Sequence, residues 1–183
     1  AYEIAVPARY GAALMAEVVK RAETMGGGAY GMEALNVLRI EKGFLTHAEM
    51  DGRVTAADLG MAGMMSAKKD FVGKVSSQRD GLIDSMREQL VGIRPVGPVR
   101  QILGGSIMVE VDADPIRENM QGHVTSVCYS PTLERMIGLA FVKGGHTRIG
   151  QTIRAVDLVR NVDTLCEIVS PQFHDPKGEK LRG

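Results

Sequence analysis

Cysteine, net charge and long apolar runs are all scarce in this sequence. Its 183 residues include two cysteines, Cys128 and Cys166, too few for the disulfide framework of a small secreted protein, so we expect buried free thiols. Lysine and arginine together number 22, as do aspartate and glutamate, and no net charge attracts nucleic acid or an anionic membrane. No apolar run approaches the roughly 18 residues of a membrane span, and residues 1–10 lack the layout of a signal peptide. We therefore expect a cytoplasmic chain without nucleic-acid or membrane partners.

The first part of the chain predicts one strand and two helices. Residues 2–6 alternate apolar and polar side chains, which indicates a strand with Glu3 on the face opposite its apolar residues. Residues 8–25 repeat apolar side chains at helical spacing and predict an amphipathic helix lying on a core. The glycines of residues 26–31 end it, and a second helix is expected from about Met32.

The second helix places an arginine among apolar residues. Met32, Leu35 and Arg39 stand at i, i+3 and i+7, so they share one helix face. We therefore expect the Arg39 guanidinium to be partly buried.

From about residue 89 the pattern changes to short apolar-rich runs between turn residues, as in LVGIRPV, HVTSVCY and MIGLAFV. Regular runs of this kind predict an antiparallel sheet closed into a small barrel or sandwich. With 44% apolar and 24% charged residues, the chain suits one large domain or two small ones. We predict an α+β fold, with a helix-containing α/β part over residues 1–88 and a small antiparallel β-barrel over residues 89–183.

Gly26, Gly28 and Gly31 spell G-x-G-x-x-G, the pattern of a dinucleotide-binding loop. That loop requires a strand before the glycines and a helix after them, so that the pyrophosphate meets a helix N-terminus. Here a helix is predicted before the glycines. Asp51 lies where the ribose-binding acid would be sought, but the motif is outside its structural context, and we favour a helix-to-helix connection.

Common catalytic and metal-binding signatures do not occur in the sequence. It has no G-x-S-x-G, no H-E-x-x-H and no paired C-x-x-C. His123, Cys128, Cys166 and His174 are residue types of a zinc site, but they lack the close pairs that such sites use. We predict no metal site and interpret the histidines as structural or surface groups.

The following stretches occur in this order along the chain: YEIAVPA, YGMEALNVLRIEKGF, DGRVTAADLGM, KKDFVGK, QLVGIRPV, GHVTSVCYSPTLERMIGLAFVKGG and VSPQFHDPKGEKLRG. Together they resemble the C-terminal part of the aminomethyltransferase family, which has the glycine-cleavage T-protein fold. LRIEKGF, KKDF-GK and the terminal F-x-DP-G-E-x-L-x-G are most similar to the branch formed by the alpha subunits of heterotetrameric sarcosine oxidases. The resemblance extends over essentially the whole chain and makes residues 1–88 part of a folate domain.

The resemblance implies an enzyme of several subunits. Such alpha subunits bind NAD in a part far upstream and tetrahydrofolate in the C-terminal part, while FAD, FMN and amine oxidation involve the partner subunits. Sarcosine is oxidised to an imine, its one-carbon unit passes to tetrahydrofolate, and glycine and hydrogen peroxide are the other products. We therefore expect tetrahydrofolate and other sarcosine oxidase subunits as partners, and no NAD, FAD or FMN on this chain.

Two residues match the folate site of the family. Glu3, in YEI, matches a glutamate that accepts hydrogen bonds from the pterin ring, where parallel N–H donors suit a carboxylate. Arg39, in LRIEKG, matches an arginine that lines the folate pocket. From the residues alone, Glu3 would be a solvated carboxylate and Arg39 would pack its stem over apolar neighbours. The resemblance favours binding roles for both.

The matched region lacks other parts of the family's site. The carboxylate that assists the chemistry belongs to the N-terminal half of the transferase unit, which has no counterpart here, so no catalytic residue is predicted. We assign no site residue in the stretch THAEMDG, because it is shorter than the corresponding region of many relatives and has a different composition. The start without an initiator methionine leads us to expect an upstream part. We expect this chain alone neither to transfer one-carbon units nor to bind folate tightly.

The alternative function is that of a structural module that holds subunits together. The many methionines suit this role, because their side chains pack adaptably at contacts.

Overall fold

A computed structural model describes residues 2–98 and 101–182. The chain divides into two compact units, Ala1–Leu35 and Asn36–Gly183, and each is described by itself. In the described ranges, no helix is long and apolar enough to cross a membrane. The helices and 3-10 turns (η) are η1 (Ala8–Tyr10), α1 (Gly11–Thr24), α2 (Met32–Lys42), η2 (Ala62–Met64), η3 (Ser76–Gln78), α3 (Asp80–Ile83), η4 (Arg117–Asn119), η5 (Gly145–Thr147) and α4 (Glu179–Arg182).

The first unit contains α1 and the start of α2, joined by a glycine-containing loop. Helix α1 ends where Gly26 adopts a φ of 77° and the N–H of Gly27 donates to the Ala22 carbonyl oxygen, 2.8 Å away. A helix therefore runs into the glycines, as predicted. The G-x-G-x-x-G sequence lacks the preceding strand that a dinucleotide site requires.

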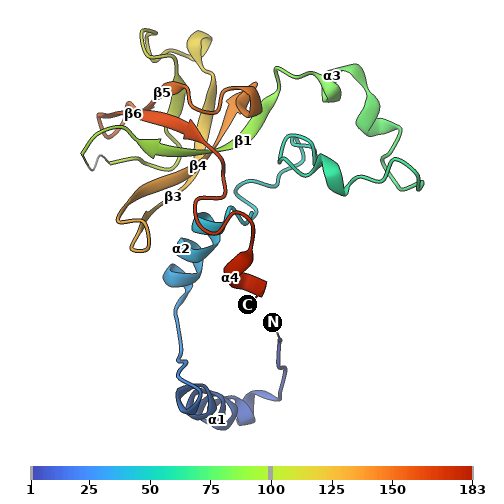
Figure 1. The fold of residues 1–183 in the computed structure, drawn as a ribbon, viewed down its shortest axis with the longest axis vertical. Coiled ribbons are helices and arrows are strands. Elements are labelled where there is room, and N and C mark those ends of the chain that lie inside the picture. Colours follow the sequence, from blue (N-terminus) through green and yellow to red (C-terminus); the bar gives the residue numbers. More distant parts are fainter. Residues whose placement is uncertain (1, 99–100, 183) are drawn as a thin grey trace. The chain divides into compact units, whose positions relative to one another are not determined.

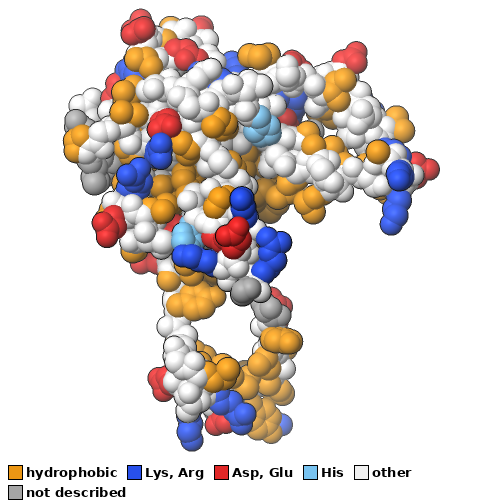
Figure 2. All heavy atoms as spheres, in the orientation of Figure 1, with side chains coloured by type: hydrophobic (Ala, Val, Ile, Leu, Met, Phe, Trp, Pro, Cys, Tyr) orange, Lys and Arg blue, Asp and Glu red, His pale blue; other side chains and the backbone are white. Residues whose placement is uncertain are grey.

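The strand predicted for residues 2–6 is wrong. Residues 2–7 have no regular secondary structure and are exposed. A strand needs a hydrogen-bonded partner, and the strands described in this structure pair only within residues 88–169. The predicted core beneath α1 is also not observed, because no side chain of α1 is buried. Its apolar side chains lie at the surface of this unit (Figure 2).

The second unit is built on a closed β-barrel, which confirms the predicted α+β fold (Figure 1). Neighbouring strands are antiparallel and follow the order β1-β4-β3-β2-β5-β6 around the barrel. Closure leaves no long unpaired edge that could join a strand of another chain. The strands are β1 (Glu88–Pro95), β2 (Ile107–Val109), β3 (Gly122–Ser130), β4 (Arg135–Lys143), β5 (Thr152–Asp157) and β6 (Val162–Val169).

Two apolar clusters hold this unit together. The barrel residues Val91, Ile93 and Met108 belong to the first cluster, together with side chains from the other strands. The second cluster joins Ile40 of α2 to residues of β1, β3 and β4, including Phe141 of β4. Strand β4 contributes to both clusters, which explains why its central residues are continuously buried. The second cluster fixes the C-terminal half of α2 against the barrel.

The C-terminal segment also fastens α2. The N–H groups of Phe173 and His174 both donate to the Glu41 carbonyl oxygen at 2.9 Å. The Lys42 ammonium lies 2.8 Å from a carboxylate oxygen of Asp175, and the other oxygen of Asp175 accepts the N–H of Glu179 at the start of α4. Packing and polar contacts therefore set the position of the last turns of α2, which carry Arg39.

Residues 44–87 form loops with short helical turns between α2 and β1. Asp58 anchors this segment. Its carboxylate accepts hydrogen bonds from both Nε and Nη2 of Arg87. Its carbonyl oxygen accepts a hydrogen bond from the N–H of Leu90 in β1. The first part of the segment is thereby tied to the barrel.

Candidate functional site

The Arg39 guanidinium lies where α2 meets β3. Its Nε donates to Asn36 Oδ1 at 2.9 Å, its Nη1 to Glu49 Oε2 at 3.1 Å, and its Nη2 to Ser126 Oγ at 2.7 Å. The Arg39 side chain is 13% exposed, which confirms that it is partly buried. The reason differs from the predicted one, because Met32 and Leu35 are 79% and 42% exposed. Polar contacts with Glu49 and β3 bury the guanidinium, not an apolar helix face.

Glu49 is the centre of this polar cluster and is only 1% exposed. Its Oε2 accepts the backbone N–H and the hydroxyl of Thr46 at 2.9 and 3.1 Å, in addition to Arg39. Its Oε1 accepts the hydroxyls of Thr125 and Ser126 at 2.8 and 2.6 Å. Burial by itself raises the pKa of Glu49, but these hydrogen bonds and the charge of Arg39 outweigh it and lower the pKa. Glu49 is therefore ionised at neutral pH, next to the guanidinium of Arg39.

Glu3 lies in the other unit. It belongs to the irregular residues 2–7 and is exposed. Within its unit it is a solvated carboxylate on a segment without a sheet, and its predicted role in folate binding stays a prediction. The same is true of the predicted folate contact of Arg39.

Two family profiles match most of the chain. The "GCVT N-terminal domain" matches residues 1–69, and the "Glycine cleavage T-protein C-terminal barrel domain" matches residues 88–175. The chain belongs to the glycine cleavage T-protein family. Within the family, it is 41% identical over 182 residues to "Sarcosine oxidase subunit alpha" of Rhizobium meliloti (strain 1021) and 36% identical over 189 residues to the protein of that name from Corynebacterium sp. (strain P-1).

More distant relatives include an aminomethyltransferase of Caldanaerobacter subterraneus, 26% identical over 98% of this chain. The fold matches the crystal structure of the glycine cleavage system aminomethyltransferase T from Bartonella henselae, with a TM-score of 0.70, 16% identity and 93% of this chain covered. The chain spans 18–19% of the two sarcosine oxidase subunits, 46% of the aminomethyltransferase and 45% of the Bartonella chain.

Sequence reasoning missed Glu49 and Ser126, which complete the polar cluster of this T-protein family chain. One local signal was present, because T-x-x-E and T-x-x-D are patterns of reciprocal side-chain capping. Thr55 and Asp58 form such a reciprocal contact. Thr46 and Glu49 form one half of it, in which Glu49 Oε2 accepts the N–H of Thr46. The contact between Glu49 and Ser126 of β3 joins residues 77 positions apart in the sequence. A contact over this distance cannot be predicted from the spacing of residues.

The two cysteines are free and buried, as predicted. Burial raises the pKa of Cys128 to about 11 and that of Cys166 to about 12, so both thiols stay protonated and weakly nucleophilic. They belong to different apolar clusters. Over residues 2–98 and 101–182, no group of three or more His, Cys, Asp or Glu is arranged to hold a metal ion.

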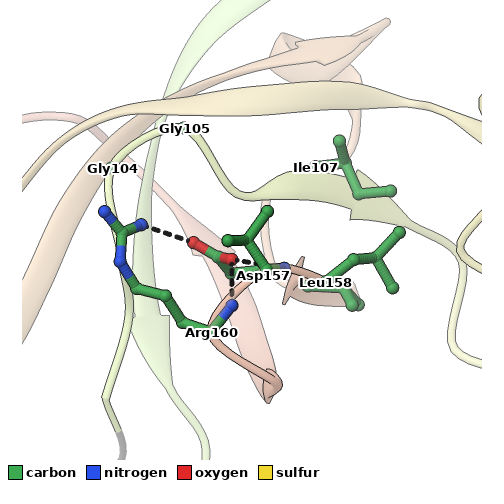
Figure 3. Close-up of a pocket in the computed structure, with 8 residues that line it drawn as sticks. Gly104, Gly105, Ile107, Asp157, Leu158 and Arg160 are labelled. Carbon is green, nitrogen blue, oxygen red and sulfur yellow. Dashed lines mark hydrogen bonds and ion pairs between the residues drawn. The ribbon is translucent and has the colours of Figure 1, made fainter.

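A surface hollow of about 400 Å³ lies beside the turn between β5 and β6 (Figure 3). Asp157 accepts the N–H groups of Val159 and Arg160 at 3.0 and 2.8 Å and pairs with the Arg160 guanidinium at 2.8 Å. The charges of Asp157 and Arg160 are therefore both engaged in stabilising the turn between β5 and β6. Neither Glu3 nor Arg39 lines this hollow, and the Arg39 cluster remains the candidate site of this unit.

Proposed function

We propose that the chain is the tetrahydrofolate-binding part of a sarcosine oxidase alpha subunit. In this proposal the complete enzyme oxidatively demethylates sarcosine to glycine, passes the one-carbon unit to tetrahydrofolate and forms hydrogen peroxide. The observation that carries it is the 41% identity to a sarcosine oxidase subunit alpha over 99% of this chain. Residues 1–88 would belong to the folate domain and residues 89–183 to the barrel domain, a division supported by the two profile matches. We assign the protein to the cytoplasm, which suits its unpaired thiols.

Arg39 suits a folate ligand because its guanidinium is held in place and still has N–H groups that form no hydrogen bond within the residues that the structure describes. Three of its N–H groups donate within the protein, and a guanidinium carries further donors. Those donors can meet the carbonyl or carboxylate oxygens of folate, and the Arg39 side chain keeps 13% of its surface exposed. Glu3 supplies the complementary acceptor, a carboxylate for adjacent N–H donors of the pterin ring.

The redox cofactors are assigned to other parts of the proposed enzyme. The only dinucleotide-like motif here follows a helix and does not fit a nicotinamide or flavin nucleotide. FAD, FMN and NAD would therefore be bound by the remaining sequence and by partner subunits. We assign no catalytic residue to this chain, whose role is to bind and orient folate.

The test uses the complete oxidase, with Arg39→Ala and Glu3→Gln compared with the wild type. We expect each variant to divert the one-carbon unit from 5,10-methylene-tetrahydrofolate to free formaldehyde, with an apparent folate affinity about tenfold weaker, because each loses a charge-assisted hydrogen bond. Peroxide production from sarcosine should change little. Arg21→Ala and Glu23→Gln, on exposed positions of α1, are the matched controls. Loss of amine oxidation together with folate coupling would contradict the assignment.

The alternative is a non-catalytic module that holds subunits of a related amine oxidase or aminomethyltransferase together. The specific observation in its favour is the exposed apolar surface of α1, on which Met15, Val18 and the adjoining Met25 are 57%, 42% and 86% exposed. Under this alternative, the chain would co-purify with the partner subunits, while Arg39→Ala and Glu3→Gln would leave folate coupling intact.

A further inference from the structure

The Arg39 guanidinium is restrained at all three of its nitrogens, by Asn36, Glu49 and Ser126. Because a guanidinium is planar, contacts at three nitrogens fix both its position and the orientation of its plane. The donors that remain must then point in set directions. Such an arrangement suits a residue that has to present hydrogen bonds to a ligand with little reorganisation.

Ser126 gives this contact an uncommon form. An arginine and a carboxylate often pair through two parallel N–H···O bonds. Here only Nη1 reaches Glu49 directly, at Oε2, while Nη2 donates to Ser126, whose hydroxyl donates on to Oε1 at 2.6 Å. The serine hydroxyl is thus inserted into one arm of the ion pair.

A β-bulge makes this insertion geometrically feasible. Successive residues of a regular strand point to opposite faces, yet Thr125 and Ser126 both donate to Glu49 Oε1. The pairing of β3 with β4 shifts register between Val124 and Ser126. Bulges redirect single side chains and occur often beside functional sites.

The contacts indicate which residue depends on which. Without Arg39, Glu49 still accepts hydrogen bonds from Thr46, Thr125 and Ser126. Without Glu49 and Ser126, Arg39 would keep only Asn36 among its side-chain partners in the described residues. Glu49 is therefore satisfied largely without the arginine, whereas the orientation of the arginine requires Glu49 and Ser126.

We infer that Glu49 and Ser126 are positioning residues, which orient Arg39 for its contact with folate through the bulge in β3. The inference rests on the proposed folate-binding function and adds a requirement to it. The orientation of Arg39 matters for binding, and so does the Ser126 hydroxyl, although that hydroxyl is buried and bonded within the protein.

The test compares Ser126→Ala, Ser126→Thr and Thr125→Val in the complete oxidase. Ser126→Ala and Thr125→Val each remove one hydroxyl that donates to Glu49, but only Ser126 also contacts Arg39. We expect Ser126→Ala to raise the KM for tetrahydrofolate about tenfold, as for a lost bond to a charged group, without changing the kcat of sarcosine oxidation. Ser126→Thr keeps the hydroxyl and should restore the KM, and Thr125→Val should shift it by less than about twofold. The melting temperature of each variant is measured as well, and the KM values are compared among variants that melt at the same temperature as the wild type.

A second measurement separates this inference from the folate assignment. In nitrogen-15 spectra of the 183-residue chain, a restrained Arg39 should show distinct Nη1 and Nη2 signals that merge in Ser126→Ala. Equal KM changes in Ser126→Ala and Thr125→Val, or merged signals in the wild type, would overturn the positioning role. An unchanged folate KM in Arg39→Ala would instead overturn the folate assignment, and with it the inference.

Discussion

Among single residues, Asp175 links the C-terminal segment to α2 by charge. The hydrogen bond from Lys42, supported by the N–H groups of Lys180 and Glu179, lowers the pKa of Asp175 from 3.8 to about 2. A carboxylate with a lowered pKa stabilises the folded state above its unfolded pKa, and this stabilisation is lost as the pH falls toward the folded pKa. We therefore expect wild type to melt a few degrees above Asp175→Asn at about pH 6, and the gap should close between about pH 4 and pH 2.

Thermal melts monitored by circular dichroism at several pH values check this expectation. The amide that replaces the carboxylate in Asp175→Asn keeps an oxygen that can cap α4, so the substitution acts mainly on the contact with Lys42. Asp70→Asn is the control, because Asp70 is fully exposed and an exposed pair contributes little. A melting difference between wild type and Asp175→Asn that does not vary with pH would show that the link is not ionic.

At the scale of elements, the end of α2 depends on Gly43. This residue has a φ of 72°, and a Cβ added there would lie 2.6 Å from the carbonyl oxygen of Pro171. Gly43→Ala therefore combines left-handed strain with a backbone clash, and we expect it to lower the free energy of unfolding by about 2–4 kcal/mol. Gly60→Ala is the matched control, since its φ is 73° but its nearest neighbour is 3.9 Å away. Urea unfolding of both variants should give a clearly larger loss for Gly43→Ala, and equal losses would rule out the clash.

The elements also show what the sequence could and could not predict. The barrel was predictable because residues such as 122–130 alternate buried and less buried side chains, a local signal. The same kind of alternation over residues 2–6 gave a wrong strand, since a strand also requires a partner at a distance in sequence. Likewise, Arg39 stood out through a local motif, whereas Glu49 and Ser126 act through a long-range contact and a bulge.

At the scale of the whole molecule, we expect the chain to present only part of the proposed folate site. It spans less than a fifth of the sarcosine oxidase subunits that it resembles. Small-ligand affinity requires burial of most of the ligand surface in a pocket with a few convergent polar groups. Glu3 is exposed and Arg39 retains only part of its donors, so the contacts available on this chain are few.

We therefore expect calorimetric titration of the 183-residue chain with 5-formyl-tetrahydrofolate to give no binding in the micromolar range, because few contacts cannot offset the entropy lost on association. The complete oxidase under the same conditions is the positive control and should bind. Arg39→Ala in the complete oxidase should weaken that binding about tenfold. Micromolar binding by the chain alone would mean that residues 1–183 already form a complete pocket, and the site would then have to be sought entirely among them.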